Sequence, residues 1–440
     1  MARLLVALLV AAAAAGCAGY SDRTEAARSA LDAGRTHEAA RLYNKALGVD
    51  SEKELPANLK GEKTLFVLDR SVILQALDQY ELSSRDLEVC DKQIEILDFA
   101  RGTLDDIAKY MFSDDAGPYQ APAYEKLMIN TLNMVNYLVR SDLNGARIEA
   151  RRLAVLQQFI SEHDGHGKAL SGPGDYLAGF TFEKSHSPGE ALRYYDEALQ
   201  YGQYTTLTDP VRRLAQQDPY RTPQLSKLIA GGPPPQDDGS ADVLVVVSYG
   251  RVPAKIARRI PIGLALTYAS GFISPYDQAR ANKLALQGLV TWVNFPELGQ
   301  PRGTYGVPEL WVDGRPVALE GMLAVDSEAQ RAWKQIQGKV IASAITRMLT
   351  RVVAGEATRR VAGGGILGLL LGLGTQATLT ATDTPDTRSW GTLPARMAFG
   401  RLRVPAGRHT LQLSVRGTVK RQTLDLPKGG WGVLNLTVLR

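Results

Sequence analysis

Hydrophobic residues in the first half of the chain recur at helical spacing, and one short pattern appears twice. The stretch 38–47 (EAARLYNKAL) returns as 190–199 (EALRYYDEAL). In both copies alanine and tyrosine lie three and four residues apart, which places them on one face of a helix. Self-similarity of this kind is typical of stacked helical repeats, because one unit cannot bury its apolar face alone. The pattern therefore predicts a helical repeat array over residues 17–230.

The repeated pattern resembles the second helix of a tetratricopeptide (TPR) repeat, where small residues mark the helix crossing and an aromatic residue follows one turn later. The residues that carry this resemblance are Ala39, Tyr43 and Ala46 in the first copy, and Gly179, Phe182, Ala191, Tyr195 and Ala198 in the last. Gly179 is expected to let the paired helices approach closely, and Phe182 to pack beside Tyr195. A bundle with alanine-rich crossings is the alternative interpretation.

Two weaker copies lie between these, one from Ser83 to Cys90 and one beginning at Ala146. The successive small positions Ala39, Ser83, Ala146 and Ala191 are 44, 63 and 45 residues apart. A regular array has a period of about 34 residues, so the repeats are predicted to be irregular. The array is expected to form a concave surface, and Cys90, in a small helix-contact position, to be a buried and inert thiol.

The pattern changes after residues 231–240 (GGPPPQDDGS), which indicate a linker. A continuous apolar run follows at 243–247, and alternating strand patterns end the chain at 410–415, 422–426 and 432–438. Asp313-Gly314 indicates a hairpin turn between two short strands. Residues 327–360 have the period of one long amphipathic helix. These patterns predict an antiparallel, sandwich-like α+β domain over residues 241–440, uncoupled from the repeats by the linker.

An apolar run at 361–374 contains six glycines, with Gly364, Gly368 and Gly372 at the spacing of close helix packing. It is too short to span a bilayer, which needs about 20 residues. A buried connector inside the domain is one interpretation. The other is a helix that packs against a bilayer or a second copy of the chain, which would make the protein a homo-oligomer.

The first 16 residues have the features of a secretory signal peptide: a basic residue, an apolar core and a run of small residues. The run ends Ala14-Ala15-Gly16-Cys17, which resembles a bacterial lipobox. This resemblance implies cleavage between Gly16 and Cys17 and acylation (palmitate among the chains) of Cys17. Ala18 in place of aspartate favours the outer membrane over the inner one. An ordinary signal peptide cut near Ala15 is the alternative.

Several motifs together resemble a family of uncharacterised bacterial lipoproteins with TPR-like repeats. They are Leu68-Asp69-Arg70, Ser84-Arg85-Asp86-Leu87-Glu88, 124–130 (YEKLMIN), 146–152 (ARIEARR), Asp386-Thr387-Arg388-Ser389-Trp390 and Leu393-Pro394-Ala395. The resemblance covers most of the mature chain. It implies a cell-envelope location and an α+β multidomain architecture, and it implies no substrate, because the family has no assigned activity.

The composition and the motifs reduce the number of functions that the chain is expected to have. The net charge is +5, and no block of like charge is present, which argues against nucleic-acid binding. Common hydrolase, zinc-protease and phosphate-loop motifs are missing from the sequence, so neither a catalytic residue nor a cofactor is expected. His163, Asp164 and His166 are expected to form a solvated loop and not a metal site. Asp386, Arg388 and Trp390 form a polar-aromatic cluster, either a docking site or a buried ion pair.

These observations predict a lipoprotein anchored to the outer membrane on its periplasmic side. Its repeats would bind one or more periplasmic or outer-membrane proteins during envelope assembly or export. One alternative is a membrane-interacting export or assembly component that uses residues 361–374. Another is an envelope enzyme with a site at the junction of the two domains.

Overall fold

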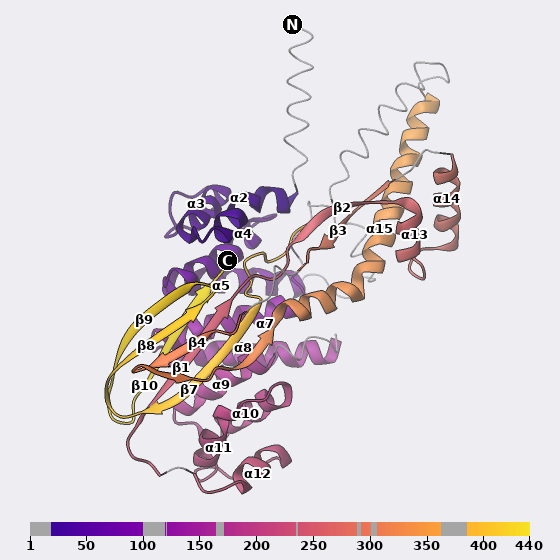
Figure 1. The fold of residues 1–440 in the computed structure, drawn as a ribbon. Coiled ribbons are helices and arrows are strands. Elements are labelled where there is room, and N and C mark those ends of the chain that lie inside the picture. Colours follow the sequence, from indigo (N-terminus) through magenta and orange to yellow (C-terminus); the bar gives the residue numbers. More distant parts are fainter. Residues whose placement is uncertain are drawn as a thin grey trace.

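The fold is α+β, with helices in the first half and three sheets in the second (Figure 1). The computed structural model describes residues 19–99, 119, 121–163, 171–234, 236–287, 292–300, 306–361 and 385–440. The helical half consists of helical hairpins followed by short helices. The helices are α2 (Tyr20–Asp32), α3 (Thr36–Leu47), α4 (Lys63–Ala76), α5 (Tyr80–Phe99), α7 (Ala123–Val139), α8 (Leu143–His163), α9 (Ser171–Lys184), α10 (Pro188–Tyr201), η2 (Thr205–Leu207), α11 (Thr208–Leu214) and α12 (Pro223–Ala230).

The hairpins α2–α3, α4–α5, α7–α8 and α9–α10 share one turn. The middle residue of each turn has a positive φ: Gly34 (73°), Asp78 (60°), Ser141 (59°) and His186 (56°). The next residue donates its N–H to the carbonyl five residues back: Arg35 to Ala30 (2.8 Å), Gln79 to Leu74, Asp142 to Tyr137 and Ser187 to Phe182 (2.9 Å each). This is the Schellman arrangement of a helix end, which a left-handed residue makes possible. The hairpins are therefore four copies of one backbone unit.

The same register fixes where the second helix of each hairpin touches the first. Five residues after each left-handed position comes a fully buried small residue: Ala39, Ser83, Ala146 and Ala191. These are the small positions that the sequence aligns. Their uneven spacing arises between hairpins, since the turn within each hairpin is constant.

The second half builds two four-stranded sheets and one two-stranded sheet. The strands are β1 (Ala241–Tyr249), β2 (Lys255–Pro261), β3 (Trp292–Leu298), β4 (Glu309–Val312), β5 (Arg315–Val317), β6 (Glu320–Ala324), β7 (Arg396–Val404), β8 (Gly407–Val415), β9 (Thr418–Leu426) and β10 (Trp431–Val438). The larger sheets have the orders β10-β1-β7-β6 and β5-β4-β8-β9. The sequence predicted antiparallel pairing throughout, and this is wrong at one place, because β1 and β10 run parallel.

Strand β1 is buried on both faces, which explains its continuous apolar run. Val243, Val245 and Val247 belong to the core between the two four-stranded sheets. Leu244 and Val246 belong to the core shared with the helices. The molecule is thus layered as helices, first sheet and second sheet, with β1 in the middle layer.

The residues expected to act as a flexible linker do not separate two cores. One apolar cluster contains residues of α4, α7 and α9 together with residues of β1, β7 and β10. The 231–240 segment is itself held against the sheet, where Gly429 donates its N–H to the carbonyl of Gly239 at 2.9 Å. Asp237 pairs with Arg403 at 3.1 Å. The expectation that the linker uncouples the halves is therefore corrected.

A third part of the second half extends away from this body as an arm (Figure 1). It consists of the antiparallel strand pair β2 and β3, the helices α13 (Ile262–Tyr268) and α14 (Pro275–Leu286) that lie between these strands in the sequence, and the long helix α15 (Val325–Val361). Ala265 of α13 and Ala269, the residue after this helix, are buried in the same apolar cluster as Ile341 and Ile345 of α15. The arm is the outlying part of the described chain.

Candidate interaction surfaces

The predicted repeat-packing residues lie inside the hairpins. Ala39, Tyr43, Cys90, Ala146, Phe182, Ala191, Tyr195 and Ala198 are buried, whereas Ala46 is exposed. Gly179 is needed for close approach, because a Cβ atom there would lie 2.3 Å from Cδ1 of Tyr195. Phe182 does not pack as expected beside Tyr195. It stacks on Tyr194 instead, with ring centroids 5.3 Å apart.

Cys90 is a buried thiol between α4 and α5. Its Sγ donates to the carbonyl of Thr64 at 3.3 Å. Burial, reinforced by the charge of Asp86, raises the pKa of Cys90 well above its ordinary value. A thiol held protonated and out of solvent is a poor nucleophile, so Cys90 acts as a small core residue.

The face formed by the first helices of the hairpins is covered by the sheet of the same chain. In α4, Gln75 contacts Thr437 of β10 at 3.1 Å. In α9, Tyr176 stacks on Phe399 of β7 with centroids 5.0 Å apart. The expected concave groove is therefore filled from within the molecule, and a partner has to use another face.

A buried charge cluster fastens α9 and α10 to this sheet. Arg401 of β7 donates to Glu183 at 2.8 Å and to the Tyr195 hydroxyl at 2.9 Å, and it also pairs with Asp242 of β1. Lys184 reaches Asp242 at 2.6 Å. Burial opposes charge on Glu183, but the charges of Arg401 and Lys184 outweigh it and lower the pKa of Glu183. Each charge in this cluster is paired, as buried charges require.

Arg388 and Trp390 are buried, Asp386 is half-buried, and the three residues do not form a docking site. Nη2 of Arg388 lies 2.7 Å from Oδ2 of Asp386. The Trp390 indole donates to the carbonyl of Leu68 at 3.1 Å, and its backbone N–H donates to Glu125 at 3.2 Å. The docking hypothesis is wrong because the cluster lies in the seam between helices and sheet, where no partner can reach it.

The neighbouring motifs meet at the same seam. Asp69 accepts hydrogen bonds from the Tyr20 hydroxyl, from the Tyr43 hydroxyl at 2.9 Å and from the N–H of Thr392 at 2.8 Å. Burial raises the pKa of Asp69, and these hydrogen bonds only partly offset that effect. The next residue, Arg70, is fully buried and pairs with Asp86 at 2.7 Å. Asp69, Arg70 and Asp86, which belong to the motifs behind the lipoprotein resemblance, therefore make buried contacts that hold the architecture together.

The outward face of α8 carries an apolar stripe. Ile148, Val155 and Phe159 are 53%, 70% and 50% exposed. Their spacing of seven and four residues puts them on one side of the helix. Arg151 and Arg152 are exposed between them. Large apolar side chains gathered on one exposed face mark an interaction site more often than single exposed ones do. This spacing is present in the sequence, but a stripe that faces the core has the same spacing.

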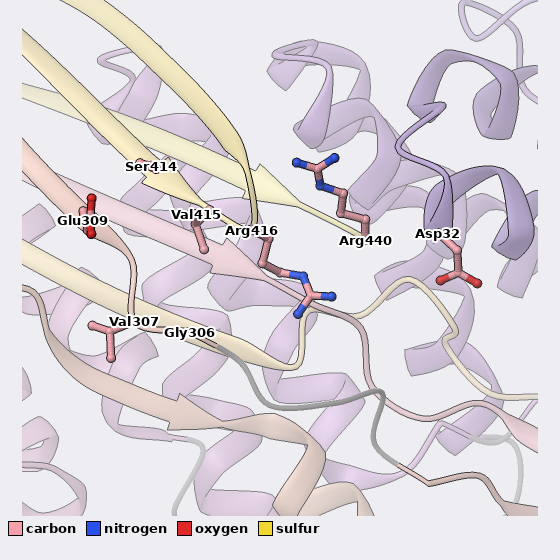
Figure 2. Close-up of a pocket in the computed structure, with 8 residues that line it drawn as sticks. All are labelled: Asp32, Gly306, Val307, Glu309, Ser414, Val415, Arg416 and Arg440. Carbon is pink, nitrogen blue, oxygen red and sulfur yellow. The ribbon is translucent and has the colours of Figure 1, made fainter.

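A pocket of about 510 Å³ lies where the first hairpin meets the second half. It is lined by Asp32, Gly306, Val307, Glu309, Ser414, Val415, Arg416 and Arg440. Figure 2 shows Arg416 directed toward Asp32, with Glu309 at the opposite end of the pocket. Asp32 also pairs with Arg251. Two carboxylates, Asp32 and Glu309, and two guanidinium groups, those of Arg416 and Arg440, give the pocket a polar lining of mixed charge.

Some predicted features fall outside the part of the chain that the structure describes. These are the signal peptide with Gly16 and Cys17, the loop residues Asp164 and His166, and the glycine-rich run 361–374 except Val361, which ends α15. Within the described ranges, no three acidic, histidine or cysteine side chains are grouped to hold a metal ion. In the same ranges, no helix combines the length and apolar character that crossing a bilayer demands.

Comparisons of the chain with models of protein families, with curated proteins and with solved structures give no match.

Proposed function

We propose that the chain is a non-enzymatic lipoprotein scaffold of the bacterial cell envelope. Cys17 is acylated and holds the molecule on the periplasmic side of the outer membrane. The helical half binds a periplasmic or outer-membrane protein involved in envelope assembly or export. The observation that carries this proposal is the exposed apolar stripe of α8, formed by Ile148, Val155 and Phe159.

The constant turn and the buried small residue five positions later support the interpretation of the hairpins as TPR-like repeats. When the sheet of the same chain covers the inner face of TPR-like repeats, a partner binds to their outer helices, which are the second helices of the hairpins. Such a scaffold displays its second helices outward while its own sheet supports the first helices. The stripe on α8 lies on a second helix and fits this arrangement.

The chemistry of the α8 stripe defines the kind of partner. Burying a large apolar side chain at an interface removes it from water and contributes about 1.5–3 kcal/mol. Arg152 is paired with Glu149 at 3.2 Å and with Asp91 at 3.6 Å. Arg151 adds positive charge between the apolar residues, so acidic groups on the partner would improve the on-rate and the specificity. The partner is therefore a protein with an apolar patch bordered by aspartate or glutamate.

Site-specific photocrosslinking in cells of the native bacterium tests this proposal. A photoreactive amino acid at Val155 is expected to give one discrete adduct, which Ile148→Lys together with Phe159→Lys removes. Val419, an apolar residue of β9 that is 55% exposed, is the matched control position. If position 155 gives no adduct, or the same adducts as position 419, α8 is not the docking face.

A further inference from the structure

The arm exposes an unusual share of the large apolar side chains. Of the fourteen that are exposed in the described chain, six lie between residues 264 and 292, with exposures from 43% to 89%. They are Leu264, Tyr268, Phe272, Tyr276, Leu286 and Trp292. They come from α13, the turn after it, α14 and the first residue of β3, which are elements of one packed unit.

These side chains lie on the outer sides of elements whose inner sides are well packed, so loose packing is not the cause of their exposure. Helix α13 buries Ile262, Ala265 and Leu266 in the core of the arm, and its other side presents Leu264 and Tyr268. Phe272 lies close over α15, because a Cβ atom on Gly338 would come within 2.4 Å of its ring. The elements are thus well packed inside and apolar outside.

The charged residues around these side chains are mostly basic. Residues 256–298 contain four basic and two acidic side chains. Both acidic groups are engaged, since Glu297 pairs with Arg258 at 2.5 Å and Asp277 accepts a hydrogen bond from the capping Ser274 hydroxyl at 2.9 Å. The guanidinium of Arg259 lies over the ring of Trp292, 5.8 Å from its centroid. Positive charge therefore accompanies the exposed aromatic residues.

From these observations we propose that α13, α14 and the start of β3 bind the surface of an anionic lipid bilayer. Tyrosine and tryptophan favour the interface between headgroups and acyl chains, where an apolar ring and a polar group are both satisfied. Basic residues beside them attract anionic lipids, and apolar burial adds to that attraction. The α8 stripe also lies beside basic residues, but none of its three apolar residues is tyrosine or tryptophan, whereas the arm exposes Tyr268, Tyr276 and Trp292.

The placement of the arm agrees with this role. In Figure 1 the arm and α2, which begins at Tyr20, both lie in the upper part of the view, at the end of the molecule away from α11 and α12. If Cys17 is acylated, three residues before Tyr20, the anchor and the arm can reach one membrane together. Only this argument, from the placement of the arm, rests on the proposed lipid anchor. The argument from the exposed apolar and basic residues of the arm does not depend on the anchor.

A fluorescent label tests the proposal on the mature chain carrying Cys17→Ser, which has no acyl chain. With Cys90 buried, an environment-sensitive label attaches at Tyr276→Cys, or at Val419→Cys as the matched control. Adding phosphatidylglycerol-containing vesicles is expected to shift the emission at position 276 to the blue and to leave position 419 unchanged. Phosphatidylcholine vesicles or added salt should weaken the shift, because the attraction is partly electrostatic.

Co-sedimentation with the same vesicles completes the test. Leu286→Ser with Trp292→Ser is expected to weaken binding about tenfold or more. Because both side chains are exposed, the variant should keep its fold, which its circular dichroism checks. No vesicle-dependent change at position 276, or an equal change at position 419, would overturn the proposal. A shift that depends on protein concentration and not on vesicles would also overturn it, and would assign the surface to a second copy of the chain.

Discussion

At the scale of single residues, Glu125 of α7 is a carboxyl group buried at the seam. It accepts hydrogen bonds from the Tyr119 hydroxyl and from the N–H of Trp390. Burial raises its pKa to about 7, although these hydrogen bonds and the charge of Lys255 oppose the shift. A glutamate in an unfolded chain has a pKa near 4.3. The folded protein therefore holds a proton on Glu125 over a pH range in which the unfolded chain has lost it.

This difference predicts that Glu125 makes stability fall as pH rises. The folded state binds more protons than the unfolded state between the two pKa values, so the free energy of unfolding decreases across that window. Between about pH 5 and about pH 8, the wild type should lose on the order of 2–3 kcal/mol more stability than Glu125→Gln. Urea unfolding at both pH values measures this. The exposed Glu190→Gln is the control, and it should follow the wild type. Parallel profiles for wild type and Glu125→Gln would show that Glu125 titrates normally.

Local pattern was enough to predict the buried small residues Ala39, Ser83, Ala146 and Ala191, because helix contacts repeat at short range. It was wrong at Ala46, which is exposed. It could not place Trp390, which bonds to Leu68 across 322 positions of the chain. A polar-aromatic cluster in a sequence is compatible with a docking site or a core, and only tertiary contacts distinguish them. The apolar stripe of α8 is visible in the sequence, but its spacing is that of a core-facing stripe, so the sequence does not show that it is exposed.

At the scale of elements, the hairpin turn is the unit that recurs. Three of the four turns put a side chain at the left-handed position, namely Asp78, Ser141 and His186, whereas the first uses Gly34. A residue with a Cβ atom pays about 1–2 kcal/mol to adopt this conformation. Glycine adopts it freely, so three of the hairpins carry local strain that the first avoids.

His186→Gly is therefore predicted to stabilise the protein by about 1 kcal/mol, and Gly34→Ala to destabilise it by a similar amount. Thermal or urea unfolding measures both changes. Ser185→Gly, one residue before the left-handed position, is the control and should bring no gain. The shared-turn interpretation would fail if His186→Gly were no more stable than Ser185→Gly.

Among the strands, the sequence predicted a hairpin turn but not a pairing between distant strands. Asp313 (φ 49°) and Gly314 (φ 77°) form the predicted hairpin turn between β4 and β5, because turn chemistry is local. The parallel pairing of β1 with β10 was missed. Its two strands are far apart in the sequence, and alternation of apolar residues indicates a strand without naming its neighbour.

At the scale of the whole molecule, helices and sheets share one core. A substitution that disrupts the helices should therefore unfold the sheets too. Ala191→Trp overfills a fully buried contact, and overpacking costs about 1–3 kcal/mol or more. Hydrogen exchange is expected to show equal loss of protection in 190–199 and in β1.

Glu190→Trp, one residue earlier and exposed, is the matched control and should leave both segments protected. Retained protection in β1 beside loss in 190–199 would restore the original expectation of two independent domains. That outcome would also mean that the Arg401 cluster and the Trp390 contacts add little to stability.

The proposed function as a lipid-anchored scaffold depends first on Cys17. Membrane fractions from cells are washed with high salt, which screens the electrostatic attachment proposed for the arm but leaves acylated chains in the bilayer. The wild type is expected to stay in the washed outer membrane, with a mass that shows cleavage after Gly16 and added acyl chains. Cys17→Ser is expected to accumulate as an uncleaved precursor without those chains. Equal partitioning and equal, unacylated masses for the two proteins would contradict the account.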